Sequence, residues 1–139
     1  MVGVVVVTHG QLAEELIRTA ESVCGQLEQC RAVSVGAPAA VEDARARLAE
    51  AIRAVDAGDG VLVLTDMFGG SPANLALTFL DEHLEVLTGV NLPMLMKLST
   101  CRSGGVPLRE TAQMLAAYAQ KNITLASELL RARALTGRN

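Results

Sequence analysis

The chain has 139 residues, a formal net charge of −3 and a hydrophobic fraction of 50%. This length predicts one domain with its own core, spanning residues 1–139. The charge excludes the basic surface that is typical of nucleic-acid-binding domains. No apolar run approaches the roughly 20 residues of a membrane span, and the N-terminus lacks the basic leader of a secretory signal. We therefore expect a cytoplasmic protein.

The predicted elements alternate between strands and helices along the chain. Four valines after Gly3 form a strand that is apolar on both faces, which indicates a central position in a sheet. Further elements follow from apolar spacing and from glycine and proline breaks. The expected strands cover residues 3–8, 31–35, 61–65 and 84–90, and the expected helices cover residues 12–23, 39–55, 72–80, a stretch after Pro93, and 108–120. This alternation predicts an α/β fold with a mostly parallel, doubly wound open sheet.

The stretch NITLAS, residues 122–127, has two interpretations. Ile123 and Leu125 alternate as they would in a short strand. Leu125, Leu129 and Leu130 also fit the apolar stripe of a helix that continues into SELLRARAL. We favour the strand.

The three cysteines, Cys24, Cys30 and Cys101, show neither C-x-x-C nor zinc-finger spacing. Their odd number and scattered positions predict free thiols with no metal or redox function.

The two loops that carry candidate chemistry follow the first and third strands. Parallel open sheets bind ligands beyond the carboxyl ends of their strands, at the point where the winding reverses. The first strand ends in THG and the third in TDMFGGSPAN. We expect these two loops to meet at that point.

The second loop has the features of an anion site. Asp66 follows a buried strand, and Gly69 and Gly70 allow positive φ and the close approach of a ligand. Ser71 followed by Pro72 predicts a helix start with a hydroxyl N-cap. Such a start directs N–H groups and positive dipole at a bound phosphate. The alternative is a tight turn with a good cap and no ligand.

His9 is the candidate nucleophile. A neutral imidazole nitrogen can attack a phosphoryl group, and a carboxylate at the other nitrogen fixes the tautomer. Asp66 would supply that carboxylate and would favour the positive ring that forms. A packed, structural His9 is the alternative. His83 lies in the polar stretch DEHLE and is expected in a surface loop.

Other phosphate-handling motifs are absent from the sequence. Thr8 stands where histidine phosphatases of the phosphoglycerate-mutase type have the arginine of Arg-His-Gly. The chain contains no GxxxxGK[ST], no GxGxxG after a strand and no G-x-S-x-G elbow.

The combination of THG, DMFGGSPAN and TGVNLPMLMKL at these intervals resembles the IIA domain of the mannose family. These domains belong to the bacterial phosphoenolpyruvate-dependent sugar phosphotransferase system, the PTS. The similarity extends to NITLAS and covers nearly the whole chain.

The resemblance implies a fold and an assembly. The fold is a parallel sheet of order 2-1-3-4 with a C-terminal antiparallel strand, here NITLAS, exchanged in a homodimer. Because the chain ends soon after that strand, we expect a single IIA domain with no fused IIB. A membrane would be involved only indirectly, through transporter components.

The resemblance also implies an activity. His9 would accept phosphate from phospho-HPr and pass it to a IIB protein in sugar uptake. Asp66 would orient His9, Ser71 would contact the phosphate together with Thr8 and Gly70, and no metal or cofactor would take part.

Three other functions stay open. Some relatives are regulators whose phosphorylation state reports metabolic supply. A related branch donates phosphate to dihydroxyacetone kinase, although its loop reads more like DLGSA than GGSPAN. The third possibility is a small-ligand-binding α/β domain in which His9 is structural.

Overall fold

The computed structural model describes residues 1–36 and 41–136. The elements run in this order: β1 (Gly3–His9), α1 (Leu12–Cys24), β2 (Cys30–Val35), α2 (Val41–Val55), β3 (Val61–Thr65), α3 (Ser71–Leu77), β4 (Leu84–Thr88), α4 (Leu92–Cys101), a 3₁₀ helix η2 (Arg102–Gly104), α5 (Leu108–Lys121) and α6 (Ala126–Thr136).

The four strands form one parallel sheet of order β2-β1-β3-β4. This arrangement confirms the predicted order 2-1-3-4 and the central place of the valine-rich first strand. Val7 pairs with Thr65 on one side of β1, and His9 pairs with Val35 on the other. The winding therefore reverses at β1, which puts the crevice between the carboxyl ends of β1 and β3.

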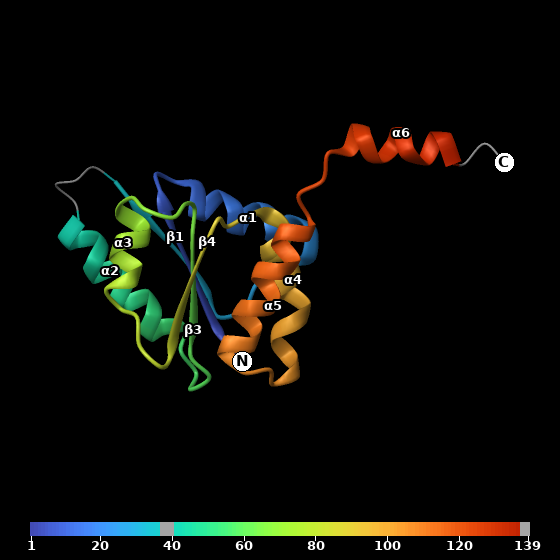
Figure 1. Ribbon diagram of the computed structural model, residues 1–139. Helices are drawn as coiled ribbons and strands as arrows, with labels where there is room; N and C mark the ends of the chain where they lie inside the picture. The colour runs from blue at the N-terminus through green and yellow to red at the C-terminus, as the bar shows by residue number, and fades with distance from the viewer. Residues whose placement is uncertain (37–40, 137–139) are drawn as a thin grey trace.

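Helices cover both faces of the sheet, and Figure 1 shows α1, α4 and α5 on one side with α2 and α3 on the other. The valines of β1 alternate between the two cores because successive strand side chains point to opposite faces. Val4 and Val6 join the core under α1, α4 and α5, while Val5 and Val7 join the core under α2 and α3. All four are fully buried.

Helix boundaries differ from the prediction where capping decides them. α4 begins at Leu92, before Pro93, because the Asn91 side chain caps it by accepting a 3.0 Å hydrogen bond from the Met94 N–H. α3 ends at Leu77, three residues earlier than expected, and its last turn continues as tighter i→i−3 bonds up to Leu80. The predicted start of α2 at residue 39 lies outside the described residues.

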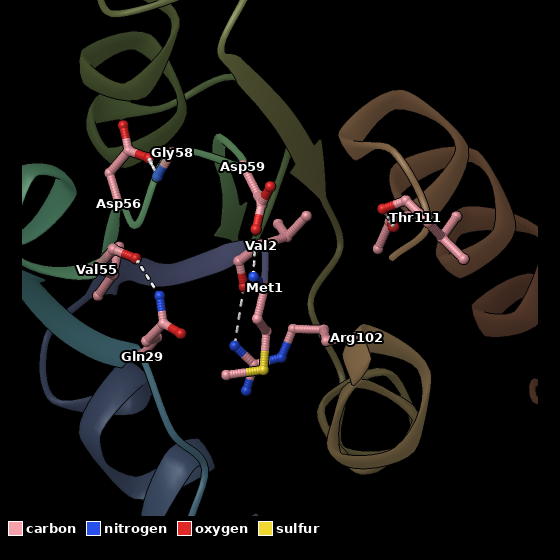
Figure 2. Close-up of polar contacts among 10 residues, drawn as sticks. Met1, Val2, Gln29, Val55, Asp56, Gly58, Asp59, Arg102 and Thr111 are labelled. Atoms are coloured by element: carbon pink, nitrogen blue, oxygen red, sulfur yellow. Dashed lines mark hydrogen bonds and ion pairs between the residues drawn. The ribbon is translucent and has the colours of Figure 1, made fainter. Parts of the chain in front are cut away.

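Arg102 fastens three segments at the amino end of the sheet, as Figure 2 shows in part. Its guanidinium donates to the carbonyls of Leu98 at 3.3 Å, Val2 at 3.0 Å and Glu28 at 2.7 Å. Only 6% of the residue is exposed, and burial lowers the pKa of its guanidinium. The side chain therefore joins the end of α4 to the starts of β1 and β2.

The prediction of a strand at NITLAS is wrong for this structure. Residues 123–125 form neither helix nor strand, and α6 starts at Ala126. The helical interpretation of the leucine spacing prevails because Ala126 to Leu135 is rich in good helix formers. Figure 1 shows α6 extending away from the other elements. Its apolar side chains are exposed, and so are those of the residues before it: Ile123, Leu125, Leu129, Leu130 and Leu135.

Candidate active site

The two predicted loops meet at the carboxyl ends of β1 and β3. His9 is the last residue of β1, and Asp66 follows the last residue of β3. His9 Nδ1 lies 2.8 Å from Asp66 Oδ2, and the same oxygen accepts a 3.2 Å bond from the His9 backbone N–H. An ionised carboxylate only accepts hydrogen bonds, so Nδ1 carries the ring proton. The lone pair is left on Nε2.

The pair is asymmetric in its exposure to solvent. The His9 side chain is 49% exposed, whereas that of Asp66 is 15% exposed. Burial raises the pKa of Asp66, but the hydrogen bonds from the His9 ring and backbone outweigh it and hold the pKa below its ordinary value. Asp66 is therefore ionised at neutral pH, with its Oδ1 buried and without a hydrogen-bond partner.

Gly70 lies against the free edge of the His9 ring. A Cβ added at this position would sit 3.1 Å from Cε1 and 3.3 Å from Nε2. The backbone also has a φ of 89°, which favours glycine. Glycine here keeps the edge that bears the lone pair open to an approaching group.

Ser71 does not cap α3 as the sequence predicted. Gly70 occupies the N-cap position, Ser71 is the first helical residue, and no side-chain hydrogen bond caps the helix. The reason is that Gly70, whose carbonyl accepts from Asn74 N–H at 3.0 Å, takes the extended turn before the helix. Ser71 is exposed, and its hydroxyl makes no hydrogen bond among the described residues.

Thr8 has a structural position that differs from the expected phosphate contact. The residue is fully buried. Its Oγ1 accepts a 2.7 Å bond from the Ala13 N–H and donates to the His9 carbonyl at 3.2 Å. The hydroxyl thus caps the first turn of α1 and ties it to the end of β1. Sequence reasoning missed this cap because Thr8 lies four residues before the helix.

The other predicted features divide between the two ends of the sheet. Gly89 and Val90 donate to the Thr65 carbonyl, both at 2.9 Å, so the GVN loop lies beside the start of the Asp66 loop. His83 is exposed in the turn before β4, at the end of the sheet opposite His9. The three cysteines are free, as predicted.

Within residues 1–36 and 41–136, no group of three or more His, Cys, Asp or Glu side chains could hold a metal ion. None of the helices in the same ranges has the length and apolar character needed to cross a membrane.

Comparison with known proteins decides the family. The family model described as the PTS system fructose IIA component, EIIA-man, matches residues 3–115. The chain belongs to the mannose/fructose family of PTS IIA components. PTS IIA components are phosphotransferase components that work with HPr and IIB proteins.

Individual relatives agree with this assignment. The chain is 37% identical to the mannose-specific EIIAB component of Escherichia coli strain K12 over 107 residues, which is 73% of this chain and 32% of that protein. The match thus covers less than half of that relative. The fructose-specific EIIA component of Bacillus subtilis is 26% identical over 132 residues, 94% of this chain and 90% of that protein.

Solved structures agree as well. The mannose/sorbose-specific IIA subunit from Enterococcus faecalis superposes with a TM-score of 0.77 at 28% identity, covering 88% of this chain and 92% of that one. An EIIA component from Streptococcus agalactiae has the same fold, with a TM-score of 0.81 at 24% identity over 92% of this chain and 99% of that one.

Proposed function

We propose that this IIA component is a phosphohistidine carrier that accepts a phosphoryl group on His9 Nε2 from phospho-HPr and passes it to a IIB protein. The observation that carries the proposal is the 2.8 Å contact between His9 Nδ1 and Asp66. It holds the proton on one ring nitrogen and leaves the other as a nucleophile at the protein surface.

The transfer step balances without a further reactant. The Nε2 lone pair forms the new N–P bond as the N–P bond of the donor histidine breaks, and the donor nitrogen keeps that electron pair. His9 Nδ1 keeps its proton, so the ring becomes positively charged. The Asp66 carboxylate stabilises this charge. Transfer to the acceptor reverses the same steps.

Gly70 and Ser71 are the proposed phosphate contacts. Gly70 leaves space beside Nε2, and Ser71, the first residue of α3, follows Gly70 directly in the chain. Pro72 has no N–H, so the first turn of this helix offers fewer donors than an ordinary helix start. The Ser71 hydroxyl therefore gains importance as a hydrogen-bond donor to the phosphoryl oxygens.

The proposal is tested by incubating the protein with phosphoenolpyruvate, enzyme I and HPr and then recording its intact mass. We expect a gain of one phosphoryl group, which is lost in His9→Gln and kept in the control His83→Gln. A His9→Gln protein that is folded and labelled as well as wild type would contradict the assignment of the nucleophile.

We further propose sugar uptake as the setting, with the choice of sugar made by the membrane components of the transporter. The names of the relatives support this division, because they differ in sugar, mannose against fructose, while the IIA role is shared.

We also propose a homodimer that forms through residues 122–136. An isolated helix of 11 residues is marginal in water, so α6 needs a packing partner. Its exposed leucines and Ile123 supply the apolar surface for one, and exchange between two copies is a low-cost way to cover it. Truncation after Gln120 should give a monomer or an aggregating protein by light scattering. A full-length protein that is monomeric at micromolar concentration would contradict the proposal.

A further inference from the structure

A pocket of about 430 Å³ opens at the amino end of the sheet, opposite His9. Its walls come from the residues just before β1 and β3 and from the segment that follows α4, and they include Asp59, Arg102, Ser103, Val106 and Pro107. Figure 2 shows Asp59 and Arg102 at this end of the sheet. We call it the Arg102 pocket. Pockets of roughly 300–1,000 Å³ hold small molecules, and the proposed phosphoryl transfer uses none of these residues.

Arg102 is a buried cation without a carboxylate partner. Its three nitrogens donate to the backbone carbonyls of Leu98, Val2 and Glu28. Within residues 1–36 and 41–136, Arg102 forms no ion pair. Buried charges are normally paired, because a lone charge loses the solvation that water gives it. The pocket wall therefore holds a positive charge that a bound anion would balance.

The guanidinium also has unused donors. It carries five N–H groups, and the three bonds to carbonyls use one N–H on each nitrogen. Each terminal nitrogen keeps a second N–H that has no partner in the described part of the chain. Ser103 follows Arg102, and its exposed hydroxyl makes no hydrogen bond among the described residues. An anion with two oxygens matches this set of donors.

The other charges of the pocket favour an anion with a single charge. Asp59 is paired with the Met1 ammonium, so these two groups balance each other. Arg102 is then the one unpaired charge among the described residues of the pocket wall. A neighbouring cavity of about 220 Å³ also includes Arg102, but Glu28 lines it. The Glu28 carboxylate would repel an anion from that cavity.

The apolar part of the wall indicates the rest of the ligand. Val2, Val106 and Pro107 contribute hydrocarbon surface to the pocket. A ligand with a short hydrocarbon chain would remove this surface from water, which is favourable. An inorganic anion would leave it uncovered. The pocket therefore suits a carboxylate that carries a small apolar group.

We infer that the Arg102 pocket binds a small monocarboxylate. The carboxylate group lies at Arg102 and Ser103, and its hydrocarbon chain lies against Val106 and Pro107. The inference does not depend on the proposed function, since the pocket is at the opposite end of the sheet from His9. Arg102 joins the end of α4 to the starts of β1 and β2, so a bound carboxylate stabilises the folded chain in proportion to its occupancy.

The test is a titration of the full ¹⁵N-labelled chain with sodium butyrate, followed by NMR at an ionic strength kept constant with sodium chloride. We expect saturable shifts of the Arg102 Nε–H and of the backbone amides of residues 102–106, with a Kd on the order of 1 mM, a normal affinity for so small a ligand. Arg102→Met should abolish the shifts, but this variant also loses the bonds that fasten the fold.

A second variant leaves those bonds in place. Val106→Trp should fill the pocket and weaken butyrate binding at least about tenfold, because overfilled space excludes the ligand. Val23→Trp is the matched control, since Val23 is 60% exposed on α1 and does not line the pocket. The control should bind butyrate as wild type does.

The other outcomes overturn the inference. Wild-type shifts that grow linearly with butyrate would show that the pocket has no specific site. Equal affinity in Val106→Trp and wild type would place the ligand elsewhere, as would shifts centred on His9 and Ser71. Sodium phosphate that binds at least as tightly as butyrate would overturn the assignment to a carboxylate.

Discussion

The Asp66 carboxylate is the group whose removal tests the geometry of the site most sharply. Asp66→Asn keeps an oxygen that can accept from His9 Nδ1 and nearly the same volume. It removes the negative charge that opposes the positive ring of phosphohistidine. The change should slow transfer to His9 while the fold survives.

The magnitude follows from the hydrogen bonds that the carboxylate makes. Oδ2 accepts from Nδ1 at 2.8 Å and from the backbone N–H of His9 at 3.2 Å. Hydrogen bonds to a charged group contribute about 1.5–3 kcal/mol. The ring becomes positively charged as the N–P bond forms, so the transition state should lose this stabilisation of about 1.5–3 kcal/mol in Asp66→Asn. The rate of transfer should therefore fall roughly 10- to 150-fold.

The assay is a rapid-quench measurement of phosphoryl transfer from labelled phospho-HPr. Asp59→Asn is the matched control, because Asp59 precedes β3 at the opposite end of the sheet, where it pairs with the N-terminal ammonium. Transfer by Asp66→Asn at the wild-type rate would refute the reasoning.

The stability of the folded protein should also depend on pH. The pKa of Asp66 is depressed in the folded protein, so its contribution is present above pH of about 4 and is lost as the pH falls through the folded value.

Three further predictions concern stability and reactivity. Ser71→Ala should slow phosphotransfer but change the free energy of unfolding by less than about 0.5 kcal/mol. Asn91→Ala should lower the free energy of unfolding by about 1 kcal/mol, because Asn91 caps α4. Equal losses of unfolding free energy in the two variants, measured with urea, would contradict this prediction. Arg102→Met should lower the free energy of unfolding by about 2–4 kcal/mol, since it leaves three carbonyls without their donor. A variant as stable as wild type in urea would contradict the stabilising role of Arg102. Burial raises the pKa of the Cys30 thiol to about 11, so iodoacetamide at pH 8 should leave Cys30 unmodified until urea unfolds the chain; rapid alkylation of the folded protein, located by peptide mass, would be the opposite result.

The sheet could be predicted because its signals are local and agree with one another. Four consecutive valines and the alternation of strands with helices determine a parallel sheet, and its winding brings His9 and Asp66 together. The pairing of these two side chains follows from topology. No knowledge of their rotamers was needed to expect it.

The caps could not be predicted because they depend on neighbouring backbone. The dipeptide Ser71–Pro72 is compatible with serine as the N-cap or as the first helical residue. Because Gly70, with a φ of 89°, occupies the N-cap position, Ser71 is the first helical residue. Thr8 caps the first turn of α1 from the other side of the THG turn. Helix-start patterns in sequence do not include a residue four positions before the helix.

Long-range contacts and the end of the chain were also beyond sequence reasoning. Arg102 reaches the carbonyl of Val2, 100 residues earlier in the chain. At the C-terminus, the same leucines fit a strand and a helix, and local propensity favours the helix where the strand would have no neighbour in its own sheet.

The central claim is that His9 carries the phosphoryl group on Nε2. The most direct test is heteronuclear NMR of protein labelled with ¹⁵N-histidine and phosphorylated through phosphoenolpyruvate, enzyme I and HPr. We predict coupling between ³¹P and Nε2 of His9, with Nδ1 still protonated and hydrogen-bonded to Asp66. Phosphorus on Nδ1, on His83 or on neither histidine would contradict the account.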